Sequence, residues 1–68
     1  MTVRLTDFWA RLEQVFGPAY AGSIAVDQVL PQLGGRTIEQ ALAQGEETVV
    51  VWREVCAAYP DRVPAQLR

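Results

Sequence analysis

The sequence predicts an all-α fold, a small bundle of three main helices plus one short helix, in a single domain over residues 1–68. Two patterns predict this fold. Apolar residues recur at spacings of three and four in several segments, which is the period of an α-helix. Glycine and proline fall between these segments, where they end helices and form turns. The apolar share of 50% is enough for a packed core and argues against disorder.

The first helix is expected over residues 6–16. Thr6 is the expected N-cap, and Asp7 suits the partly positive first turn. Gly17 followed by Pro18 ends the helix, because glycine adopts the left-handed backbone and proline cannot continue the hydrogen-bond ladder. The apolar stripe that should face the core consists of Leu5, Phe8, Trp9, Leu12, Val15 and Phe16.

A second helix is expected to begin at Pro18, whose fixed φ suits a first helical turn, and to run to Leu30 before Pro31. Apolar residues surround most of this segment. A helix that is apolar on most sides is usually buried, so we expect it to be the central helix. Asp27 is one of its few polar residues.

A short third helix should begin at Thr37, because Thr37 and Gln40 fit the capping-box pattern. Gly34 and Gly35 before it form a flexible break, and Gly45 after it ends the helix. Two turns are unstable alone in water, so this helix must be held by packing of its apolar face.

The fourth helix is expected over residues 47–58, although its run of β-branched residues at 48–51 would also suit a strand. No second strand is available to satisfy the backbone of an isolated one, so we favour the helix. The tail should contain one short turn over residues 64–67, docked through Val63 and Leu67.

The composition excludes several classes of function. The net charge is −2 and the six basic residues, all arginine, are scattered, which makes nucleic-acid binding unlikely. With no histidine and a single cysteine, Cys56, we expect no disulfide within the chain, no metal site and no cofactor. The longest apolar run is too short to cross a membrane, and no secretion signal is visible, so we expect a cytoplasmic protein.

Arg36 is the sharpest candidate for a binding residue. Between a glycine break and a helix start, its guanidinium could hold a carboxylate or phosphate of a partner. The plainer interpretation, which we favour, is internal pairing with Asp27, Glu39 or a carbonyl at a helix end. Trp9 and Trp52 could likewise form an exposed hot spot for a partner, but in so small a chain they more often fill the core.

Two further residues are weaker candidates. Cys56 has no histidine to activate it, so we interpret it as a small core residue rather than a nucleophile. Asp27 could be a buried acid, but one carboxylate without a catalytic partner is weak evidence, and a hydrogen-bonding role is more plausible. No set of residues forms a catalytic site, and we expect no enzyme activity.

Several motifs in order resemble a known family. They are Arg4-Leu5-Thr6-Asp7-Phe8-Trp9, Phe16-Gly17-Pro18-Ala19-Tyr20-Ala21, Leu33-Gly34-Gly35-Arg36-Thr37, Ala41-Leu42 with Gly45, Val51-Trp52-Arg53 with Val55-Cys56, Val63-Pro64 and Leu67-Arg68. Their order and spacing resemble domain-of-unknown-function family 3046, small uncharacterised proteins of actinobacteria. The resemblance covers nearly the whole chain. It implies a cytoplasmic helical protein without an assigned activity, encoded near the recombinase and its regulator.

The predicted function is therefore a small non-catalytic module for protein–protein interaction or self-association. The alternative is a helix-turn-helix-like protein that binds nucleic acid or assists DNA repair, with the third and fourth helices as the motif. Against the alternative, the fourth helix begins Glu46-Glu47, where a recognition helix needs cations.

Overall fold

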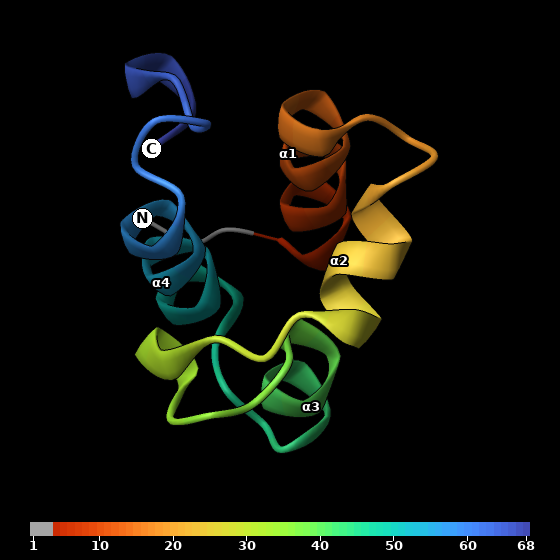
Figure 1. Cartoon of the computed structure of the whole chain (residues 1–68), viewed down its shortest axis with the longest axis vertical. Helices are drawn as coiled ribbons and strands as arrows, with labels where there is room; N and C mark the ends of the chain where they lie inside the picture. The colour runs from red at the N-terminus through yellow and green to blue at the C-terminus, as the bar shows by residue number, and fades with distance from the viewer. Residues whose placement is uncertain (1–3) are drawn as a thin grey trace.

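The computed structural model describes residues 4–68 and confirms the all-α bundle of three main helices and one short helix. Figure 1 shows α1 and α2 side by side, α4 across from them and α3 at one end of the molecule. An isolated antiparallel bridge joins Leu30 and Arg36, and the described residues form no strand. The elements are α1 (Leu5–Phe16), α2 (Ala21–Asp27), η1 (Pro31–Leu33), α3 (Ile38–Ala43), α4 (Thr48–Ala58) and η2 (Ala65–Leu67), where η marks a 3₁₀-helix.

Helix α1 begins one residue earlier than expected, and Thr6 is not its N-cap. An N-cap residue has a non-helical backbone, and here Arg4 has it, with φ −73° and ψ 154°. The helix ends at Phe16 as predicted, and Gly17 follows with φ +87°. Phe8, Leu12 and Phe16 form the buried face, whereas the predicted stripe member Leu5 is exposed.

Helix α2 is shorter than predicted at both ends. It begins at Ala21 rather than Pro18, because residues 18–20 form a turn in which the N–H groups of Tyr20 and Ala21 both donate to the Gly17 carbonyl. It ends at Asp27 rather than Leu30. A residue that precedes proline is biased away from the α-region, and Leu30 before Pro31 is extended, with φ −106° and ψ 123°. The extended backbone lets Leu30 reach the core, where it is buried.

The expectation that the second helix is central and buried is also wrong. Only Ala21 and Ala25 of α2 are buried, and the helix packs against α1 and α3 through this side. Ile24 is half-buried and packs against the edge of the core, whereas the other large apolar residue of the helix, Val26, is exposed. Val26 is 54% exposed, and Val29, just after the helix, is 59% exposed.

The expectations for the last two α-helices are confirmed. Helix α3 follows Thr37 and buries Ile38 and Ala41, and Gly45 with φ +94° forms the turn that leads to α4. The β-branched run is helical, since α4 spans Thr48–Ala58. It begins one residue later than expected.

One hydrophobic core joins all four α-helices, η1 and the tail. Phe8 of α1 is at its centre, with edge-on ring contacts to Trp9 (5.6 Å between ring centres) and Trp52 (5.7 Å). Such edge-to-face pairs are favourable because the positive ring edge meets the negative ring face. The buried core residues are Phe8, Leu12, Phe16, Ala21, Ala25, Leu30, Leu33, Ile38, Ala41, Val51, Trp52, Val55 and Val63.

The C-terminal tail folds back onto α4, as expected from the sequence. Val63 is buried, and η2 forms the predicted short turn with Leu67 half-buried. The indole Nε1 of Trp52 donates a hydrogen bond of 2.7 Å to the Leu67 carbonyl. This bond ties the tail to the middle of α4.

Candidate functional site

Arg36 bonds internally, as the plainer interpretation predicted. Its Nε donates to the carbonyl of Leu33 (2.8 Å), at the end of η1, and its Nη1 donates to Oε1 of Gln44 (2.7 Å). Its Nη2 is 3.5 Å from a carboxylate oxygen of Glu46. A helix-end carbonyl was among the partners expected for Arg36; within residues 4–68 its side chain forms no hydrogen bond or ion pair with Asp27 or Glu39. All three guanidinium nitrogens are engaged, so Arg36 is a structural link rather than a free anion clamp.

The segment around Arg36 is a tight turn followed by a capped helix. Gly34 and Gly35 both have positive φ, at +67° and +79°, which other residues adopt with strain. The capping box is complete: the Thr37 N–H donates to Oε1 of Gln40 (2.9 Å), and the Gln40 N–H donates to Oγ1 of Thr37 (3.1 Å). These contacts hold the Arg36 backbone on both sides.

The two tryptophans lie in different surroundings. Trp52 is 3% exposed and belongs to the core, so it is not an exposed anchor for a partner. Trp9 is half-buried and packs against the core edge beside Phe8. Neither indole forms the exposed hot spot that the sequence left open.

Neither Cys56 nor Asp27 lies in surroundings that suit the reactive role considered for it, a nucleophile for Cys56 and a buried acid for Asp27. Cys56 is a free, half-buried thiol packed against the core. Burial raises its pKa, and the charges of Arg68 and Arg11 oppose this only in part, so the thiolate needed for nucleophilic attack is disfavoured. Asp27 is exposed at the end of α2 and is not a buried acid.

A cleft that the sequence did not predict lies between α1, α4 and the tail. It has a volume of about 480 Å³ and includes three arginines from these three parts of the chain. Arg11 and Arg53 are far apart in sequence, and only the packing of α1 against α4 and the return of the tail bring them to one cleft. The lining residues are Arg11, Val49, Trp52, Arg53, Cys56, Gln66 and Arg68.

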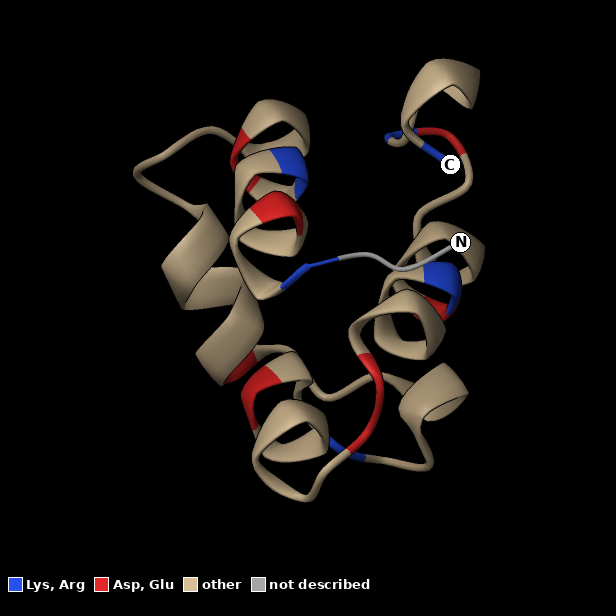
Figure 2. Cartoon of the chain, turned by 180° about the vertical axis from the view of Figure 1, so that it is seen from behind, with Lys and Arg blue, Asp and Glu red and all other residues tan. Residues whose placement is uncertain are grey.

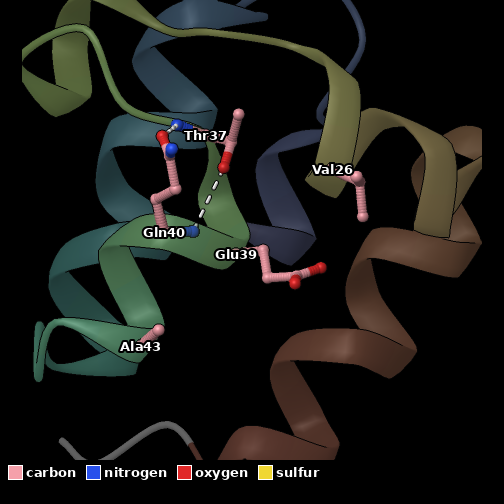
Figure 3. A pocket seen from close by; sticks show the side chains of 5 residues that line it. All are labelled: Val26, Thr37, Glu39, Gln40 and Ala43. Carbon is pink, nitrogen blue, oxygen red and sulfur yellow. Dashed lines mark hydrogen bonds between the residues drawn. The ribbon is translucent and has the colours of Figure 1, made fainter.

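A second, smaller hollow lies between α2 and the α3 segment. Its volume is about 280 Å³. Figure 3 shows Val26 on α2, across the hollow from Thr37 and Glu39. Gln40 and Ala43 complete the lining. The capping box therefore forms one wall of this hollow, and the exposed Val26 forms another.

Neither a metal-binding cluster nor a membrane-spanning helix is present within residues 4–68. Within residues 4–68, no three side chains of the metal-binding types come together. None of the described helices has the length and apolar character that a membrane span requires; the longest, α1, has 12 residues, against about 20 for a bilayer.

Comparison with known families gives a match. A family described as "protein of unknown function (DUF3046)" matches residues 3–66, nearly the whole chain. The chain belongs to this family. The resemblance inferred from the motifs is thereby confirmed. Comparisons with curated proteins and with solved structures gave no match.

Within this DUF3046 fold, α3, the Gly45 turn and α4 are arranged in the order that a helix-turn-helix motif would use. The start of α4 is acidic, however. Glu47 is the N-cap residue of α4, and Glu46 beside it pairs with Arg36. An element that enters a DNA groove usually presents cations or hydrogen-bond donors at this end.

Proposed function

We propose that this DUF3046 protein is a small, non-catalytic protein-interaction module that uses the exposed side of α2. The observation that carries the proposal is that three large, exposed apolar residues lie on or directly beside α2: Tyr20 before its first residue, Val26 within it and Val29 just after it. Tyr20 is 68% exposed, Val26 54% and Val29 59%. Among the described residues, only Leu5 joins them as a large exposed hydrophobic side chain.

The charge distribution supports the same surface. Helix α2 carries a single charged residue, Asp27 at its end, so its ribbon is almost entirely tan, the colour of uncharged residues, in Figure 2. Covering Val26 and Val29 removes apolar area from water, worth roughly 1 kcal/mol or more for each side chain. The hollow beside Val26 gives a partner side chain a place to insert.

The absence of convergent reactive groups supports a binding role over catalysis. Catalytic mechanisms need a nucleophile, base or metal that acts with partners. The chain has no histidine, the guanidinium of Arg36 is engaged, and burial shifts the pKa of Cys56 away from reactivity. The proposal places the module in the cytoplasm, where a free thiol remains reduced.

The alternative function that the sequence suggests is nucleic-acid binding or assistance in DNA repair. The acidic start of α4 weighs against it. A fluorescence-polarisation titration with duplex and single-stranded oligonucleotides at low salt tests this alternative directly. We expect no binding at micromolar protein, because charge attraction should be strongest under these conditions.

The main experiment combines light scattering with affinity capture from native cells. We expect self-association or a specific captured protein with the natural sequence. The double variant Val26→Lys/Val29→Lys should weaken that association at least about tenfold, since buried apolar contacts dominate interface energy. Gln14→Lys adds a positive charge at an exposed residue of α1, away from the residues that carry the proposal, and should retain the association. A strictly monomeric protein that captures nothing would contradict the proposal.

A further inference from the structure

The cleft between α1, α4 and the tail has an apolar floor and a cationic rim. Half-buried Val49 and Cys56 provide most of the accessible apolar lining, and Trp52, only 3% exposed, backs them from the core. Trp52 is held in place by the core and by its bond to the Leu67 carbonyl. The floor is therefore rigid, which lowers the entropic cost of binding a ligand there.

Three of the six arginines of the chain line this cleft: Arg11, Arg53 and Arg68. No aspartate or glutamate is among its lining residues, although the chain has eight acidic residues and a net charge of −2. The lining of the cleft is therefore positively charged, although the molecule as a whole carries a net negative charge. A cleft lined by one sign of charge attracts ligands of the other sign.

The three arginines differ in how they are held. The Arg68 guanidinium is fixed by hydrogen bonds to the carbonyls of Pro60 and Val63. No hydrogen bond or ion pair engages the Arg11 or Arg53 side chain within the described part of the chain. These two guanidinium groups are available to a ligand. Burial raises the pKa of the Cys56 thiol in the same cleft, and the nearby charges of Arg68 and Arg11 oppose this shift in part.

We propose that this cleft binds a short acidic segment of a partner protein, with one apolar side chain of that segment on the floor. A guanidinium group offers paired N–H donors that match a carboxylate, so Arg11 and Arg53 can each hold one. A cleft of about 480 Å³ is of ligand-pocket size and accommodates a few residues rather than a folded surface.

Charge and shape favour a peptide over a nucleic acid as the occupant. Binding to a duplex needs several cations spread along the phosphate backbone, whereas these three arginines surround a compact apolar floor. An apolar side chain of a peptide can pack on this floor, whereas a phosphate backbone cannot. The inference concerns a different surface from the α2 surface of the proposed function, so either can fail alone.

The test is a selection from a displayed library of random dodecapeptides against the full chain, at physiological salt. We expect enriched peptides to carry aspartate or glutamate around one apolar residue. Arg11→Gln and Arg53→Gln should each weaken binding of the selected peptides about three- to tenfold, as expected for loss of a charge-assisted hydrogen bond that is partly exposed. Arg4→Gln removes the same charge from an exposed arginine outside the cleft lining and should change binding less than twofold.

Cys56 supplies a readout that depends on the location of the peptide. It is the only cysteine and it lines the cleft, so a bound peptide should slow its labelling by a maleimide at mildly alkaline pH. Val26→Lys/Val29→Lys should leave both peptide binding and this protection unchanged, which separates the cleft from the α2 surface.

Several results would overturn the inference. They are the absence of enriched peptides, enrichment of peptides that are not acidic, equal binding by the Arg53→Gln and natural proteins, and protection of Cys56 by an oligonucleotide at physiological salt. A concentration-dependent mass together with self-protection of Cys56 would assign the cleft to a second copy of the chain and would also contradict it.

Discussion

Arg36 connects three separate parts of the chain through one guanidinium group. It reaches back to the end of η1 at Leu33, forward to Gln44 after α3, and to Glu46 before α4. Its backbone also bonds across the turn, where the Leu30 N–H donates to the Arg36 carbonyl (3.0 Å). The side chain is 28% exposed, so these contacts are partly shielded from water. Arg36 should therefore contribute to stability more than a typical surface arginine.

We expect Arg36→Ala to reduce the free energy of unfolding by about 1–2 kcal/mol. The hydrogen bond to the Leu33 carbonyl is charge-assisted, and its loss leaves that carbonyl without this donor. For a chain of this size, such a loss lowers the melting temperature by roughly 5–15 °C. Thermal melting followed by circular dichroism and urea unfolding measure the effect.

Two variants separate the contributions of Arg36. Arg53→Ala removes an exposed arginine and should change stability by less than about 0.5 kcal/mol. Glu46→Gln removes only the ion pair, whose partners are 28% and 39% exposed, and should cost under about 0.5 kcal/mol. If Arg36→Ala melted at the same temperature as the natural protein, the structural role of Arg36 would be wrong.

At the scale of the element, the start of α3 depends on the Thr37–Gln40 capping box. The helix has only six residues, from Ile38 to Ala43, and cannot form alone. Thr37 is 7% exposed, and its hydroxyl satisfies the Gln40 N–H, one of the first-turn donors that have no partner within the helix. Because α3 also forms a wall of the hollow beside α2, its cap affects both stability and the proposed interaction surface.

We expect Thr37→Ala to cost about 1–2 kcal/mol, because it removes the N-cap acceptor and leaves the Gln40 N–H unsatisfied. Thr37→Ser keeps the hydroxyl and should recover most of this loss. Thr6→Ala is the matched control, since Thr6 is exposed within α1 and is not its N-cap. Urea unfolding of the three variants measures the difference. Equal losses from Thr37→Ala and Thr6→Ala would exclude the capping role.

The elements also show which features the sequence can predict. The capping box of α3 and the break at Gly17 depend on residues within one turn of each other, and both were predicted correctly. The extent and burial of α2 were not, because they depend on distant residues. Leu30 lies outside the helix and pairs with Arg36, and the side of α2 that carries its two buried alanines, rather than Val26, meets α1 and α3.

At the scale of the whole molecule, the candidate cleft also depends on residues far apart in the sequence, so the sequence alone does not predict it. Its arginines come from α1, α4 and the tail, so the sequence presents them as scattered charges. The bond from Trp52 to the Leu67 carbonyl, which secures the tail, has no local signature. By contrast, the sequence does predict that Arg36 bonds internally, because an arginine beside a helix end commonly finds a carbonyl there.

The small size of the chain makes its stability depend on a few core residues. A core in a chain of 68 residues rarely supplies more than about 3–5 kcal/mol of net stability. Phe8 is fully buried and contacts both tryptophan rings. Truncation of a buried phenylalanine to alanine costs about 3–5 kcal/mol, since it removes apolar contacts and leaves a cavity.

Phe8→Ala should therefore remove nearly all the stability of the isolated chain and leave it largely unfolded at room temperature. Phe8→Leu keeps much of the apolar volume, should cost roughly 1–2 kcal/mol and should still unfold cooperatively. Circular dichroism and tryptophan fluorescence measure both variants, because Trp9 and Trp52 flank the substituted ring. If Phe8→Ala retained a cooperative transition near that of the natural protein, the stability would have to come from self-association, and its melting temperature would then rise with protein concentration.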